Sequence, residues 1–184
     1  MRHGGGMQNG RNLVNLALIG FMGTGKTSVG RLAAEHLDFE FLDTDDIIQE
    51  RTGRSIADIF AYEGEAVFRT LEQQLVRELA GRRKTLISTG GGLPTNPDNL
   101  TSLKAHSLVV CLWASPDKIW ERVCHQGHRP LLNAPDPRGK IHELLAVREP
   151  FYKQADVLVN TDLRTLREVA HQVVHQFRFA QPGA

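Results

Sequence analysis

The sequence predicts an α/β fold, a three-layer α/β/α sandwich around a central parallel sheet of about five strands. Short apolar runs recur along the chain, and each is followed by a longer stretch with helical periodicity, the pattern of βαβ units. The runs lack strict alternation of apolar and polar residues, as expected for strands covered by helices on both faces. A glycine-rich turn joins the first run to the first helical stretch, as in folds that bind phosphate groups.

Five apolar runs mark the expected strands, at residues 13–19, 39–42, 85–88, 108–113 and 157–159. The periodicity predicts helices at about 26–37, 56–80 with a break near Gly64, 117–126, 140–149 and 163–176. Two helix starts carry capping signatures. Ser55 precedes Asp58 by three residues, and Ser115 precedes Pro116, whose missing N–H costs nothing in a first helical turn.

The 184 residues fit one domain, expected over residues 13–184. Residues 1–12 contain three consecutive glycines and are expected to form a flexible tail. Residues 125–140 read HQGHRPLLNAPDPRGK, which is dense in Pro and Gly and longer than an ordinary connection. Loops of this kind are usually lids or binding loops. We expect a mobile lid over about residues 123–140, with a surface loop of no function as the alternative.

Composition excludes several classes of partner. Lys and Arg total 22 and Asp and Glu total 21, a formal net charge of +1 that is too even for a nucleic-acid-binding face. No apolar run reaches the roughly 18 residues of a membrane span, and the N-terminus lacks a secretory signal. Cys111 and Cys124 give neither a disulfide framework nor a zinc motif. We therefore expect a cytoplasmic protein without nucleic-acid or membrane partners.

A phosphate-binding loop is predicted at residues 20–27, which read GFMGTGKT and match G-x-x-x-x-G-K-[ST]. Glycines let backbone N–H groups converge on phosphate oxygens, and the helix N-terminus and Lys26 add positive charge. The Thr27 hydroxyl would hold Mg²⁺. A glycine-rich turn without a ligand is the alternative, which the flanking strand and helix disfavour. The loop predicts ATP or GTP binding, with contacts at Gly23, Thr24, Gly25, Lys26, Thr27 and Ser28.

Acidic residues follow the second predicted strand, and glycines follow the third. Asp43, Asp45 and Asp46 stand at a strand's carboxyl end, where open α/β sheets bind ligands. A carboxylate there could complete a Mg²⁺ shell through water or hold a substrate hydroxyl; N-capping of a helix by Asp45 or Asp46 is the alternative. The third run ends in three glycines, residues 90–92, rather than in the Asp of many ATPases and GTPases. Such glycines permit close backbone approach to a small ligand, although a tight turn also explains them.

These residues resemble the shikimate kinase family. The segments GFMGTGKTSVGRLAA, LDTDDII, GRSIADIFAYEGEAVFRTLE, STGGG, RPLL and REPFY stand in the family's order at family-like spacing, over about residues 13–176. The resemblance implies a P-loop kinase, acting as a monomer, that uses ATP and Mg²⁺ to phosphorylate the 3-hydroxyl of shikimate. The products are shikimate 3-phosphate and ADP, on the pathway to chorismate and the aromatic amino acids.

The resemblance also implies a substrate site, with a substrate-binding helical segment at about residues 44–80. Shikimate carries a carboxylate and three ring hydroxyls, and arginine suits the carboxylate because it pairs in a bidentate way. Glu72 would steady Arg69 in an i,i+3 pair, which without the resemblance would read as an ordinary surface ion pair. The implied substrate contacts are Arg69 and Arg148 for the carboxylate, Asp45 and the backbone of Gly90, Gly91 and Gly92 for the hydroxyls, and Phe60 and Phe68 as pocket walls.

For the transfer itself, the resemblance implies that fixed positive groups meet the charge of the moving phosphoryl group. Lys26 and Mg²⁺ would do so from one side, with Thr27 and Asp43 holding the metal, and Arg129 from the lid on the other. Asp45 would orient the attacking hydroxyl and accept its proton. The matching adenine contacts are Arg122, whose guanidinium stacks on the base, and Arg164. Leu166 stands where the family often has proline, a departure from the pattern.

Two other functions fit parts of the pattern. A related small-molecule kinase, for instance one acting on gluconate, shares the phosphate-binding loop and lid but does not need two arginines converging on a carboxylate. A nucleotide-binding regulatory module without catalysis is the third interpretation. The presence of Lys26, Thr27, Asp43, Asp45 and Arg129 together disfavours it.

Overall fold

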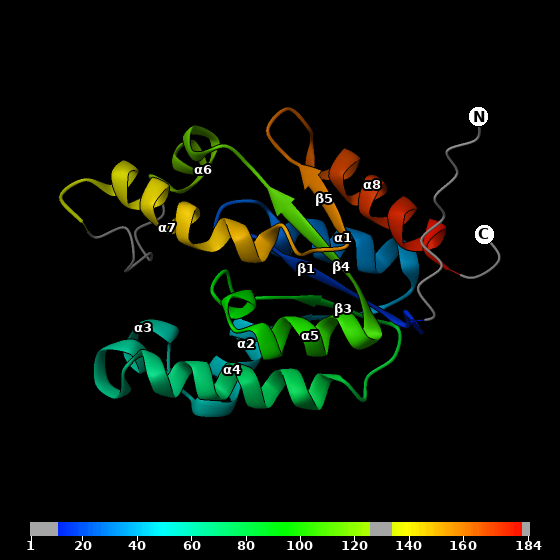
Figure 1. The fold of residues 1–184 in the computed structure, drawn as a ribbon, viewed down its shortest axis with the longest axis horizontal. Helices are drawn as coiled ribbons and strands as arrows, with labels where there is room; N and C mark the ends of the chain where they lie inside the picture. Colours follow the sequence, from blue (N-terminus) through cyan, green and yellow to red (C-terminus); the bar gives the residue numbers. More distant parts are fainter. Residues whose placement is uncertain (1–10, 126–133, 182–184) are drawn as a thin grey trace.

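A single parallel sheet forms the centre of the computed structural model, which describes residues 11–125 and 134–181. The strand order is β2-β3-β1-β4-β5, and all four pairings are parallel (Figure 1). The predicted architecture and all five predicted strands are confirmed. The strands are β1 Asn15–Ile19, β2 Glu40–Asp43, β3 Thr85–Ser88, β4 Ser107–Trp113 and β5 Val157–Asn160.

Helices connect the strands, and several begin at the residues that the capping signatures indicate. Ser55 accepts a hydrogen bond from the Asp58 N–H, and Ser115 accepts one from Lys118 with Pro116 in the first turn. The predicted break at Gly64 separates a short π-helical turn from the next helix. The helices are α1 Lys26–Leu37, α2 Thr44–Thr52, α3 Ile56–Asp58, η1 Ile59–Glu63, α4 Glu65–Leu79, η2 Leu93–Thr95, α5 Pro97–His106, α6 Pro116–Val123, α7 Pro137–Tyr152 and α8 Leu166–Phe179.

Two apolar clusters, one on each face of the sheet, pack the sheet between two layers of helices. Leu16 and Leu18 of β1 pack with α1 and α8, which lie side by side in Figure 1. Ala17 and Ile19 point to the opposite face and pack with residues of α2, α4, α5, α6 and α7. Successive side chains of a strand face opposite ways, so the unbroken apolar run of β1 is buried on both sides. The carboxyl ends of the strands therefore meet at one edge, between the two helical layers.

The helix α5 was not predicted, and α2 was expected only as part of the helical segment at about residues 44–80 that the family resemblance implies. In α2, only Thr44 and Ile48 are buried, which is too few residues to establish a helical period. In α5, the Asn96 side chain caps the helix and Pro97 occupies its first turn, a local start signal that the sequence does contain. Short helices with a narrow buried stripe are therefore marked better by their caps than by their apolar pattern.

The structure describes part of the expected tail and part of the expected lid. Arg11, inside the tail expected at residues 1–12, is anchored: its guanidinium donates to both Asp156 oxygens at 2.7 and 2.9 Å. The expected lid, about 123–140, is described only at its ends, and Arg129 lies outside the described residues. No helix in residues 11–125 and 134–181 has the length and apolar character needed to cross a bilayer.

Candidate active site

The loop between β1 and α1 presents the uncapped N-terminus of a helix. Gly25 stands at the N-cap of α1 with φ 93°, a left-handed conformation that favours glycine. No side chain caps this end, and the first turn of α1 contains no acidic residue. The first N–H groups and the positive end of the helix dipole therefore face outward together, an arrangement suited to an anion. Lys26 Nζ adds a full charge beside them and donates to the carbonyls of Gly20 and Phe21, both at 2.9 Å.

Side chains of this loop divide into those that brace it and those that face solvent. The Thr24 hydroxyl is buried and donates to the Phe21 carbonyl at 2.8 Å, which closes the turn. A phosphate contact from Thr24 must therefore come from its backbone N–H. Thr27 and Ser28, in the first turn of α1, are exposed and can turn toward a ligand.

Oxygen ligands suited to Mg²⁺ lie where α1 and β2 come together. Thr27 Oγ1 lies 3.0 Å from Asp43 Oδ2, so a hydroxyl and a carboxylate share one spot beside the phosphate-binding loop. No group of three or more His, Cys, Asp or Glu side chains converges within the described ranges. Magnesium is commonly held by one or two protein oxygens together with phosphates and waters, so this donor set fits the ion.

Asp43 also caps α2, which corrects one prediction. Its side chain accepts from the Asp45 N–H at 3.1 Å, so Asp43 is the N-cap residue. The sequence had suggested Asp45 or Asp46 for that role. Both of those acids lie instead in the first turn of α2, so neither carboxylate caps the helix.

The three glycines after β3, residues 90–92, bring charged side chains from three helices to one stretch of backbone. A Cβ carbon added at Gly90 would lie 2.6 Å from Asp45 Oδ1. One at Gly91 would lie 3.4 Å from an Arg148 nitrogen, and one at Gly92 would lie 2.6 Å from an Arg69 nitrogen. A side chain at position 90 or 92 would displace the carboxylate of Asp45 or the guanidinium of Arg69, so the glycines do more here than form a tight turn. The spacing also places Asp45, Arg148 and Arg69 around a common point.

The triple-glycine segment is held from both sides. The Gly90 N–H donates to the buried Thr44 hydroxyl at 3.0 Å, which fixes the segment beside α2. On the other side, the Tyr152 hydroxyl donates to the Gly91 carbonyl at 2.7 Å, which fixes it to α7. Because the Gly90 N–H is already engaged, hydrogen bonds from this segment to a ligand fall to its other N–H groups.

The two predicted arginines differ in how their charges are balanced. Arg69 pairs with Glu72 at 2.7 Å and with Glu65 at 2.8 Å. Arg148 is 8% exposed and lies 5.5 Å from the centre of the Phe21 ring. Within residues 11–125 and 134–181, no carboxylate lies within ion-pair distance of Arg148. Glu72 acts on Arg148 through its charge without forming an ion pair, so the buried guanidinium is only partly balanced and favours an incoming anion.

Aromatic rings stand beside Arg69. The Arg69 guanidinium lies 5.4 Å from the centre of the Phe68 ring, and the Phe60 and Phe68 rings are 5.0 Å apart. Phe68 is buried and Phe60 is partly buried. These rings give the arginine side of the site an apolar wall.

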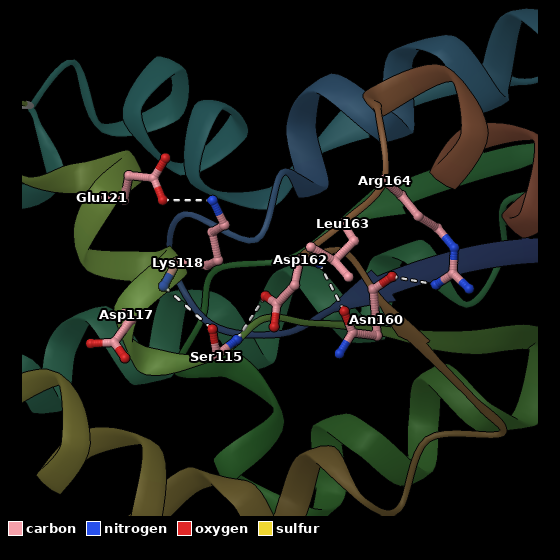
Figure 2. A pocket seen from close by; sticks show the side chains of 8 residues that line it. All are labelled: Ser115, Asp117, Lys118, Glu121, Asn160, Asp162, Leu163 and Arg164. Atoms are coloured by element: carbon pink, nitrogen blue, oxygen red, sulfur yellow. Dashed lines mark hydrogen bonds and ion pairs between the residues drawn. The ribbon is translucent and has the colours of Figure 1, made fainter.

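The other end of the site lies toward a cleft between α6 and the loop after β5. Arg122 donates to the Gly23 carbonyl at 3.2 Å and to the Thr161 carbonyl at 2.7 Å, so it joins the phosphate-binding loop to this loop. Arg164 is exposed and donates to the Asn160 carbonyl at 2.6 Å. The cleft has a volume of about 670 Å³ and is seen in Figure 2; its lining residues are Ser115, Asp117, Lys118, Glu121, Asn160, Asp162, Leu163 and Arg164.

Comparison with protein families shows which family has this arrangement of residues. The shikimate kinase family model matches residues 22–178. The chain belongs to the shikimate kinase family. The match begins inside the phosphate-binding loop and includes the rest of that loop, the triple-glycine segment and both arginines.

Individual members of the shikimate kinase family agree along nearly their whole lengths. The shikimate kinase of Pelotomaculum thermopropionicum is 45% identical over 161 residues, which are 88% of this chain and 94% of that protein. The shikimate kinase of Thermodesulfovibrio yellowstonii is 40% identical over 169 residues, 92% of this chain and 98% of that protein. The structure of shikimate kinase from Acinetobacter baumannii in complex with shikimate has a TM-score of 0.87 at 37% identity, covering 92% of this chain and 96% of that one.

Some residues of the site were not predicted from the resemblance to shikimate kinases. Phe21 occupies a variable position of the phosphate-binding loop, so the motif gave it no role. Thr44 stands between the two predicted aspartates, and Tyr152 stands one helical turn after Arg148. Adjacency to predicted residues was the available signal for Thr44 and Tyr152. Glu65 forms an i,i+4 pair with Arg69 and could have been found by the same spacing argument that identified Glu72.

Glu72 is a buried carboxylate of the candidate site, with a raised pKa. Its side chain is 0% exposed, and its Oε2 accepts from Arg69. Its Oε1 is buried without a hydrogen-bond partner among the described residues and faces Gly90. Burial raises the pKa of Glu72 from 4.5 to about 7, against the opposing charge of Arg69 and with a further rise from Asp45. A proton on Oε1 would leave Oε2 free to keep its bond to Arg69.

This raised pKa predicts a pH-dependent stability. Between pH 4.5 and about 7 the folded state binds a proton at Glu72 that the unfolded state has lost. This proton stabilises the folded state at low pH, and the stabilisation disappears as the pH rises through 7. Relative to the native chain, Glu72→Gln is therefore expected to gain up to about 3 kcal/mol in unfolding free energy from pH 5 to pH 8. Urea denaturation at several pH values measures it.

Glu65→Gln is the matched control, because Glu65 pairs with the same arginine but its side chain is 64% exposed. Its difference from the native chain should stay flat across this range. A flat difference for Glu72→Gln as well would contradict the raised pKa.

Proposed function

We propose that this chain carries out the activity of its family at the site described above, the transfer of the terminal phosphoryl group of ATP to the 3-hydroxyl of shikimate. One observation carries the assignment of the site. A Cβ carbon added at Gly91 would lie 3.4 Å from the Gly20 carbonyl of the phosphate-binding loop and 3.4 Å from the Arg148 guanidinium. The triphosphate end and the carboxylate end of the site therefore meet on one residue, at a separation that a single small ring can span.

The carboxylate of shikimate would bind between Arg69 and Arg148. Arg148 offers a buried guanidinium that has no carboxylate within ion-pair distance in the described part of the chain, whereas Arg69 is already paired and would add a second, preorganised donor. The solved relative from Acinetobacter baumannii contains shikimate, and its high structural similarity supports this substrate class. The ring hydroxyls would then face Asp45 and the triple-glycine segment.

At the reacting end, Lys26 and the N-terminus of α1 would oppose the charge on the transferred group. Thr27 and Asp43 would hold Mg²⁺, which when bound supplies positive charge to the phosphates. Asp45 would orient the attacking hydroxyl and accept its proton, and orientation is the larger part because a loose transition state needs little base assistance. Arg129, outside the described residues, would approach the phosphates from the lid.

The remaining assignments complete the proposal. Arg122 would stack on the adenine and Arg164 would approach it, next to the cleft of Figure 2. Residues 123–140 would close over the nucleotide and exclude water, and residues 13–184 would act as one domain. We further propose a cytoplasmic monomer without nucleic-acid or membrane partners. The two free thiols, Cys111 and Cys124, are typical of a reducing compartment.

A coupled ADP-release assay with shikimate, quinate or gluconate as acceptor tests the function. We expect shikimate-dependent release of ADP, with at most a low rate for gluconate because an open chain does not hold its carboxylate and hydroxyls at the fixed distance of a ring. Activity on gluconate but not on shikimate would identify the related kinase instead. Release with none of the acceptors, despite nucleotide binding, would favour the regulatory module.

A further inference from the structure

Tyr152 has no task in the reaction as described so far, although it ends the segment REPFY that helped to identify the family. It is the last residue of α7 and is 2% exposed. Arg148 precedes it by four residues, so the two side chains lie on the same face of the helix. Pro150 stands between them and lacks the N–H that would otherwise bond within this turn. The position of the turn therefore depends more than usual on side-chain contacts.

The Tyr152 hydroxyl lies where two parts of the substrate site come together. It donates to the Gly91 carbonyl at 2.7 Å. An Arg148 nitrogen would lie 3.4 Å from a Cβ carbon added at the same glycine, so Gly91 has the Tyr152 hydroxyl and the Arg148 guanidinium beside it. Burial raises the pKa of the hydroxyl, so it stays protonated as a donor, and the nearby charge of Arg148 opposes this rise.

We propose that Tyr152 is a positioning residue for the acceptor substrate, whose hydroxyl sets the spacing between Arg148 and the backbone of Gly91. This inference rests on the proposed function. A cyclic acid has a nearly fixed distance between its carboxylate and its ring hydroxyls, so a site that binds both groups must hold its two sets of contacts at a matching distance. Without the hydroxyl, Arg148 retains its charge but loses its fixed place relative to Gly91.

A purely structural role is the competing explanation, because buried tyrosine hydroxyls usually find a hydrogen-bond partner. The two explanations differ in which constants change. Tyr152→Phe keeps the ring and its packing and removes only the hydroxyl. Loss of positioning should weaken acceptor binding about tenfold, in both the shikimate Kd measured by calorimetry without nucleotide and the KM for shikimate. The KM for ATP should stay within about twofold.

The matched control is Ile141→Val, which removes one methylene from a fully buried side chain of the same helix. It should lower the melting temperature while leaving the shikimate constants unchanged. Unchanged shikimate constants in Tyr152→Phe would overturn the proposal. So would an equal rise in both variants, because that would indicate general loosening of α7.

Adding Tyr152→Phe to the Arg148→Ala variant tests whether Tyr152 acts through Arg148. If Tyr152 acts by placing Arg148, then Tyr152→Phe should change the shikimate Kd much less when Arg148→Ala is already present. An equal change in both backgrounds would overturn the positioning of Arg148. The native chain's ADP release with shikimate tests the proposed function separately, and the calorimetric comparison decides the role of Tyr152 whatever that assay gives.

Discussion

Replacement of Arg148 by alanine is expected to raise the KM for shikimate by about two to three orders of magnitude. Truncating one partner of a buried, hydrogen-bonded charge pair costs on the order of 2–5 kcal/mol, and each 1.4 kcal/mol is a factor of ten. Arg148 is 8% exposed and has no carboxylate partner among the described residues, so the substrate carboxylate would supply its counter-charge. The KM for ATP should be nearly unchanged, since Arg148 lies at the acceptor end.

Steady-state kinetics with each substrate varied in turn measures this split. Arg148→Lys should give an intermediate KM for shikimate, because lysine keeps the charge but loses the bidentate geometry. Arg77→Ala serves as the control, since Arg77 is an exposed arginine of α4 outside the site. An equal rise in both KM values for Arg148→Ala would contradict the proposed role, because it would indicate disruption of the whole cleft.

The contrast between Arg148 and Arg69 is one that the sequence could not predict. Motif matching placed both arginines on one carboxylate but treated them as equals. In the folded chain, Arg69 has two carboxylate partners from its own helix, at positions fixed by helical spacing. The isolation of Arg148 depends instead on which residues α7 meets across the sheet, and that is tertiary information. The structure therefore distinguishes the two arginines by the carboxylates around them, which the motif does not.

Local sequence signals predicted the fold well for the strands that are buried on both faces of the sheet. The strands β1, β3 and β4 are buried along nearly their whole length, and their apolar runs were unambiguous. The helix α2, which carries Asp45, was expected only through the helical segment at about residues 44–80 that the family resemblance implies, because its short polar sequence shows no period. Similarly, the phosphate-binding loop was predicted from its motif, whereas the contact between Gly91 and Gly20 required the pairing of β1 with β3. The motifs indicate the chemistry of the phosphate-binding end and of the acceptor end of the site, and the sheet topology brings these two ends together.

Asp45→Asn is expected to lower kcat by about two to four orders of magnitude, the range typical for loss of a positioned general base. Asparagine has nearly the same size, but its amide is neutral and offers one acceptor oxygen where the carboxylate offers two, so it neither takes up the proton nor orients the attacking hydroxyl as the carboxylate does. The KM for shikimate should therefore change much less than kcat. Circular dichroism and the melting temperature should match the native chain, because the α2 cap is Asp43 rather than Asp45.

Asp46→Asn is the matched control for this prediction. Asp46 is the next residue in the same first turn of α2, but it is exposed and its nearest ion-pair partner is Arg31 at 3.9 Å. Surface pairs of this kind contribute little, so kcat should stay near the native value. If Asp45→Asn and Asp46→Asn reduced kcat equally and mildly, the Asp45 carboxylate would be neither base nor orienting group. The position of the carboxylate beside Gly90 favours the large, site-specific loss, because that segment faces the same ring hydroxyls.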